Sequence, residues 1–136
     1  MACPYFRPLA RLESNSWVVP PRLPLGDAYS GECLAATDPF QPDEQRMREV
    51  CNLGYGRGRC ERFPEESPSD AIRFHIARDA GELLSIQYVF ERDCWPHSHG
   101  SFDCSSTQGA LENAPADEIL RQQAAAFVRS YVRRRS

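Results

Sequence analysis

The residues best suited to chemistry are four cysteines in the first half of the chain. Cys3, Cys33, Cys51 and Cys60 are separated by 29, 17 and 8 residues. Zinc sites and iron–sulfur clusters both take up to four thiolate ligands. The segment from Cys51 to Cys60 brackets a loop rich in glycine and arginine, which would supply half of such a site. The pattern therefore predicts a four-cysteine metal centre.

The spacing favours a [4Fe–4S] cluster over zinc. Structural zinc sites commonly place paired ligands about two to four residues apart, and none of these four cysteines is so close to another. Clusters tolerate dispersed ligands, and Pro4 after Cys3 matches a feature of ferredoxin-type motifs. Zinc and unligated thiols are the alternatives. Arg57, Arg59 and Arg62 could offset the negative charge of a thiolate-ligated cluster, or they could form an ordinary salt-bridged surface.

A second constellation reads C-x2-H-x-H-x4-C and comprises Cys94, His97, His99 and Cys104. A turn over 96–100 would place Cys94 opposite Cys104, as neighbouring thiols or a labile disulfide. The same four residue types could also hold zinc, but incidental clustering is the favoured interpretation. Cys94 with His97 or His99 could act as a nucleophile and base, but we identify no oxyanion hole and no third residue that would orient the histidine. We therefore assign no catalytic residue.

The first 42 residues contain seven of the eleven prolines, which argue against long helices and central strands. A short helix is expected over 43–54, with Gly54 as a left-handed C-terminal cap. Residues 64–70 are the best candidate linker. We expect a loop-rich cysteine module over 1–66, folded by its metal because it has few periodic apolar positions.

The clearest strands are 72–78 and 84–90, in which apolar residues fall at every even position except Arg78. A turn at 79–81, with Gly81 left-handed, would join them into a hairpin over about 71–92. Its apolar pairs would be Ile76–Leu84, Phe74–Ile86 and Ile72–Tyr88. A third strand at about 101–106 would add Phe102 and Cys104 to the same face.

The C-terminal segment predicts an amphipathic helix over about 115–134. Its apolar stripe should cover the hairpin and consists of Leu120, Ala124, Phe127, Val128 and Tyr131. Hairpin and helix together form the part over 70–136. The expected fold is one α+β domain over 1–136.

The composition and charge limit which classes of partner the protein could bind. The net charge is −3, which argues against a dedicated nucleic-acid binder. All sixteen basic residues are arginines, and a local contact to nucleic acid or an acidic partner would use those at the C-terminus: Arg129, Arg133, Arg134 and Arg135. We expect a cytoplasmic protein, because the sequence contains neither a signal peptide nor a membrane span. Cysteines in that reducing compartment more often bind metal than form disulfides.

The opening Cys3-Pro4-Tyr5-Phe6 and the segment Cys51-Asn52-Leu53-Gly54-Tyr55 resemble uncharacterised small bacterial proteins that share this four-cysteine layout. The resemblance supports treating the four cysteines as a set. It does not extend to Cys94 or Cys104, and it implies no activity.

The sequence thus predicts a small iron–sulfur protein that transfers electrons or serves as an accessory subunit of a larger redox assembly. Trp17, Trp95 and Tyr55 are candidate contacts to that partner, although core packing is the commoner role for each. The alternative is a zinc-stabilised interaction module that binds protein or nucleic acid through its arginine-rich C-terminal helix.

Overall fold

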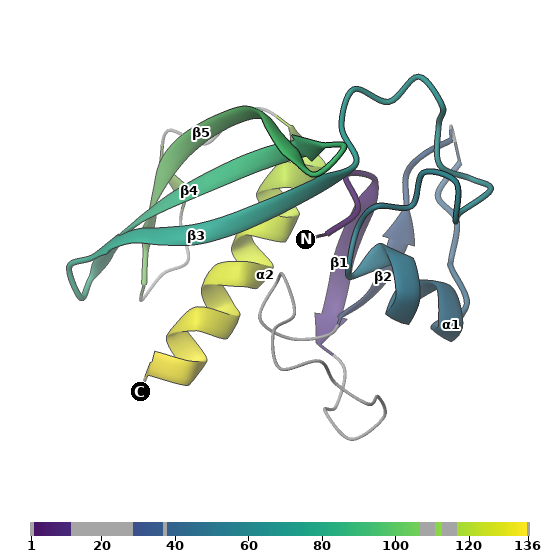
Figure 1. Ribbon diagram of the computed structural model, residues 1–136. Helices are drawn as coiled ribbons and strands as arrows, with labels where there is room; N and C mark the ends of the chain where they lie inside the picture. Colours follow the sequence, from purple (N-terminus) through teal and green to yellow (C-terminus); the bar gives the residue numbers. More distant parts are fainter. Residues whose placement is uncertain (1, 12–28, 37, 107–110, 113–116, 136) are drawn as a thin grey trace.

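The computed structural model describes residues 2–11, 29–36, 38–106, 111–112 and 117–135. The fold is α+β, as expected. It contains a two-stranded sheet of β1 (Phe6–Arg11) and β2 (Tyr29–Cys33), and a four-stranded antiparallel sheet in the order β3-β4-β5-β6. Those four strands are Ala71–Asp79, Leu83–Arg92, Trp95–Ser105 and Leu111–Glu112. The long C-terminal helix α2 (Glu118–Arg135) packs under the larger sheet and alongside β1 (Figure 1).

The β1–β2 pair lies in the segment where we expected only extended loops. Proline lacks the N–H needed inside a sheet and is tolerated on edge strands. Both strands of this two-stranded sheet are edges, so Pro8 is accommodated opposite Gly31. A bulge between Pro8 and Ala10 shifts the register. The pairing is long-range, and the local pattern of prolines did not reveal it.

The predicted helix over 43–54 forms in two pieces. Asp43 caps α1 (Glu44–Arg46) by accepting a hydrogen bond from the N–H of Arg46 at 2.7 Å. The chain continues as the π-helical turn η2 (Met47–Cys51). Gly54 ends the segment with a φ of 81°, which confirms the left-handed cap.

The predicted hairpin is confirmed, but its register was wrong by two residues. Ile76 pairs with Ile86 rather than Leu84. A bulge after Ile76 extends β3 to Asp79, and the connection closes through a hydrogen bond from Ala80 N to Leu83 O at 3.0 Å. Gly81 is left-handed, as expected, with a φ of 88°. Up to Ile76 the shift is even, so these side chains keep their predicted face; the other corrected pairs are Phe74–Tyr88 and Ile72–Phe90.

The third strand is longer than predicted, and the turn expected over 96–100 was wrong. β5 begins at Trp95, and the connection from β4 is the two-residue turn Asp93–Cys94, whose φ angles are 51° and 68°. Both residues are left-handed, as in the type I′ turns that suit twisted hairpins. The usual Asn-Gly or Asp-Gly signature is absent at Asp93–Cys94, so the sequence pattern did not reveal it. Phe102 and Cys104 are buried on the apolar face, as expected.

The helix and the hairpin cover each other as predicted. Asp117 caps α2 by accepting from Leu120 N at 3.0 Å. Phe127 stacks on Phe74 with ring centroids 5.5 Å apart, and the Tyr131 hydroxyl donates to Asp79 at 2.7 Å. Residues 115 and 116, where the helix was expected to begin, lie outside the described residues. The core therefore lies between α2 and the larger sheet and extends to the first cysteine.

Candidate metal centre

The four predicted cysteines come from four separate segments that meet beside α1 and the N-terminal end of β1. Cys3 lies in the turn before β1, Cys33 ends β2 and Cys51 ends η2. Cys60 follows the glycine-rich loop, and its N–H donates to Gly56 O at 2.7 Å. The backbone links two of the segments directly, because Cys3 N donates to Cys51 O at 3.1 Å.

Electrostatics place the four thiols in one neighbourhood. Burial is the main cause that raises the pKa of Cys3 to about 12. The Cys33 and Cys60 thiols also raise this pKa, and the facing N–H groups of Tyr5 and Phe6 lower it in part. Burial also raises the pKa of Cys51, with added effects of the other three thiols. Coulombic effects decay with distance, so these mutual influences require proximity. At neutral pH Cys3 and Cys51 are protonated unless a cation stabilises the thiolate.

The group is half enclosed. Cys3 and Cys51 are buried, whereas Cys33 and Cys60 are partly exposed. Cys60 borders a surface depression of about 640 Å³ whose other walls include Arg57, Arg59 and Phe63. All six cysteines of the chain lie among the described residues and are free thiols. A cofactor held here would be shielded on one side and approachable on the other.

The described residues do not form a ready-made site for a single metal ion. Tetrahedral zinc with bonds of about 2.3 Å needs sulfur atoms about 3.8 Å apart. Within the described part of the chain, no three His, Cys, Asp or Glu side chains are grouped to hold one ion. In a [4Fe–4S] cluster each cysteine binds a different iron, so the sulfurs stand further apart. A set of four cysteines is a donor set that either a cluster or a zinc ion could use.

The nearby arginines have different roles from those expected. Arg57 is paired with the buried Asp70 at 2.7 Å, and Arg59 is exposed. Arg62 lies 3.8 Å from the centroid of the Phe40 ring, and its buried Nε has no hydrogen-bond partner among the described residues. Arg46, which the sequence pattern did not single out, lowers the pKa of Cys51. Positive charge close to the thiols thus comes from the helix as well as from the loop.

Two buried amides hold the cysteine segments together, and both were missed in the sequence. Asn52 accepts from Tyr29 N at 3.0 Å and donates to Tyr29 O at 2.9 Å, which joins the end of η2 to β2. Gln123 of α2 donates to Cys3 O at 2.7 Å and to Phe6 O at 2.8 Å. A polar residue inside the apolar stripe of a helix was the available signal for Gln123.

The structure does not bring the residues of the second constellation together. Cys94 is exposed in the β4–β5 turn, whereas Cys104 is buried and pairs with Leu84 near the other end of β5. About nine residues of strand, on the order of 30 Å, separate them. His97 and His99 are exposed on β5 between the two cysteines. The expectation that Cys94 faces Cys104 across a turn was therefore wrong.

The candidate partner contacts differ in exposure. Trp95 is 75% exposed at the β4–β5 turn, whereas the Tyr55 hydroxyl is used internally and donates to Glu91 at 2.9 Å. Trp17 lies outside the described residues. A groove of about 560 Å³ between β1 and α2 carries Arg129 and Arg133. None of the described helices combines the length and the apolar character needed to cross a bilayer.

Comparisons of the chain with protein-family models, with curated proteins and with solved structures found no match.

Proposed function

We propose that Cys3, Cys33, Cys51 and Cys60 bind a [4Fe–4S] cluster, and that the protein transfers electrons or serves as an accessory subunit of a larger redox assembly. The observation that carries this proposal is the convergence of four thiols from four segments. The wide separation of these cysteines along the sequence favours a cluster over zinc. A donor set made only of cysteines is the usual ligand set of such a cluster.

Further features of the site support this assignment. The N–H groups of Tyr5 and Phe6 face the sulfur of Cys3, and hydrogen bonds to sulfur tune cluster potentials. When bound, the cluster supplies one-electron redox chemistry; the chain holds it, shields its Cys3 and Cys51 side and leaves Cys33 and Cys60 nearer to solvent.

Partner and location follow from the same reasoning. A small protein with one redox centre needs a second redox protein to exchange electrons with, so a larger redox protein or complex is the expected partner. Six free thiols suit a reducing compartment, and a cytoplasmic location is part of the proposal.

The second candidate function is a zinc-stabilised interaction module, favoured by the groove that carries Arg129 and Arg133. Arginine forms forked contacts with carboxylates and phosphates, so an acidic protein or a nucleic acid would be its ligand. In that case the four thiolates would stabilise the fold and perform no redox chemistry.

Anaerobic purification with metal and sulfide analysis tests the proposal. The expected result is a brown protein with about four iron and four sulfide per chain. Its visible absorption should bleach with dithionite, and a paramagnetic signal should appear on reduction. Serine substitution of any of the four cysteines should reduce the iron content. Cys94→Ser is the matched control and should leave it unchanged, because Cys94 lies in the exposed turn. A colourless protein with one zinc would establish the second candidate, and a metal-free protein would overturn both.

A further inference from the structure

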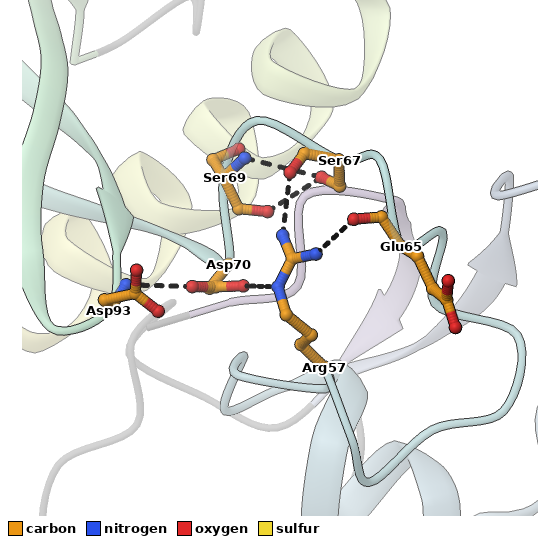
Figure 2. A network of polar contacts seen from close by, with 6 residues as sticks. All are labelled: Arg57, Glu65, Ser67, Ser69, Asp70 and Asp93. Atoms are coloured by element: carbon orange, nitrogen blue, oxygen red, sulfur yellow. Dashed lines mark hydrogen bonds and ion pairs between the residues drawn. The ribbon is translucent and has the colours of Figure 1, made fainter.

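Asp70 contacts both the cysteine loop and the β4–β5 turn. Its carboxylate accepts from Arg57 Nε at 2.7 Å and from Asp93 N at 2.9 Å, so both oxygens are engaged. Its backbone N–H donates to Glu91 O at 2.7 Å, and its carbonyl accepts from Tyr55 N at 3.0 Å. Asp70 itself is only 2% exposed. Figure 2 shows the carboxylate between Arg57 and Asp93. We call the contacts among Arg57, Asp70 and Asp93 the Asp70 clamp.

Arg57 of the Asp70 clamp also binds the segment between Cys60 and β3. Arg57 donates through its other two nitrogens to the carbonyls of Glu65 and Ser67, the latter at 2.7 Å. Its guanidinium also lies 5.2 Å from the centroid of the Phe63 ring. All three donor nitrogens of Arg57 are thus engaged, two by backbone carbonyls and one by the Asp70 carboxylate (Figure 2). A lysine could not reproduce this fork.

The position of the Asp70 clamp bears directly on the thiols. Tyr55 and Arg57 lie between Cys51 and Cys60, and both are held by Asp70. Without these contacts the loop would be free to move Cys60 away from the other three cysteines. Groups that orient metal ligands typically change metal affinity by 10–100-fold when removed. The buried charge pair is therefore placed where it can set the geometry of the centre.

We infer that Asp70 is a positioning residue for the four-cysteine centre, which acts through Arg57 to hold Cys60 beside Cys3, Cys33 and Cys51. This inference rests on the proposed function for its metal-binding consequence. Its geometric consequence, the fixed position of Cys60, holds for the metal-free protein as well.

The test uses Asp70→Asn in the full chain, with two measurements. In the anaerobically purified protein, iron should be lost to a ferrous chelator about 10–100-fold faster than in wild type. In the reduced, metal-free protein, alkylation of Cys60 by iodoacetamide, followed by mass spectrometry, should be several-fold faster. Cys104 is fully buried in the larger sheet and should stay unreactive, which reports that the fold is intact.

Asp79→Asn is the matched control. Asp79 also accepts from a turn N–H and from a side chain, Gly81 N at 2.8 Å and Tyr131 Oη at 2.7 Å, but it lies at the β3–β4 turn. Asp79→Asn should change neither the rate of iron loss nor the rate of Cys60 alkylation by more than about twofold. Because Arg57 and Asp70 act as one unit, the double variant Arg57→Gln/Asp70→Asn should match the more affected single variant.

The inference is wrong if Asp70→Asn loses iron and alkylates Cys60 at rates within twofold of wild type while Cys104 stays protected. That result would leave the cluster proposal intact. If Asp70→Asn exposes Cys104 and so fails to fold, Arg57→Gln carries the test under the same thresholds. That change removes the ion pair from its half-exposed side. If wild type binds no metal, the proposed function fails, and the alkylation rates alone decide whether the Asp70 clamp holds Cys60.

Discussion

Replacing Gly56 with alanine should destabilise the protein, although its backbone would accept the new residue. Gly56 does not have a positive φ, and at such a position alanine usually stabilises by about 0.4–1 kcal/mol through the unfolded chain. Here the added Cβ would lie 2.8 Å from Val50 Cγ1 and 3.4 Å from both Cys60 Cβ and Phe63 Cδ2. Val50 is buried and stiff, so it cannot move aside cheaply.

Overpacking of this kind costs about 1–3 kcal/mol, which exceeds the gain. We therefore expect a net loss of about 0.5–2 kcal/mol in the free energy of unfolding, or roughly 2–7 °C in melting temperature for a domain of this size. Urea denaturation of the reduced, metal-free protein measures the first quantity. In the same variant Cys60 should be displaced, so iron retention should fall as well.

A double-mutant cycle with Val50→Ala isolates the contact. Removing the Val50 methyl groups makes room for the new Cβ, so the two changes should couple by about 0.5–2 kcal/mol. Gly58→Ala is the control: nothing lies within 4 Å of its Cβ, and only its φ of 80° is unfavourable. Gly58→Ala should lower the free energy of unfolding by about 1–2 kcal/mol, and its effect should be additive with that of Val50→Ala. The steric argument is wrong if Gly56→Ala raises the melting temperature or shows no coupling to Val50.

Three further predictions concern the rest of the fold. Tyr29→Phe should cost about 1–2 kcal/mol in urea denaturation, because the buried hydroxyl loses its 2.8 Å hydrogen bond to Ser130; an unchanged midpoint would contradict this. Burial raises the pKa of Asp70, but the Asp93 N–H and Arg57 outweigh it and hold the pKa below its ordinary value. The resulting stabilisation is present above about pH 3.9 and lost as pH falls through the lower folded-state pKa. Asp70→Asn should remove that loss, so parallel curves for the two proteins in urea titrations from pH 2 to 5 would refute the assignment. Trp95→Ala should change stability by less than about 0.5 kcal/mol, as checked by thermal melting, because the side chain is 75% exposed.

The sequence alone determined the elements whose signals are local. Alternation at even positions identified the buried face of β3 and β4, and that face survived the register error because the shift was even. The helical stripe around Leu120 and Phe127 predicted what α2 covers. Gly54 and Gly81 marked two of the places where the chain turns with positive φ. The four cysteines were predicted as a set from their residue type and their positions in the first half of the chain.

Only the tertiary structure decided how distant segments meet. The β1–β2 pairing, the register around the bulge after Ile76 and the Asp93–Cys94 turn depend on contacts that no short window contains. The same holds for Arg57, which looked like a counter-charge for a cluster and instead binds Asp70. Hydrophobic periodicity specifies which face of an element is buried, but a hydrogen-bonding partner is selected by three-dimensional proximity. The sequence therefore predicted a set of four cysteines. The fold determined that Asn52 bonds to Tyr29, Gln123 to Cys3 and Asp70 to Arg57.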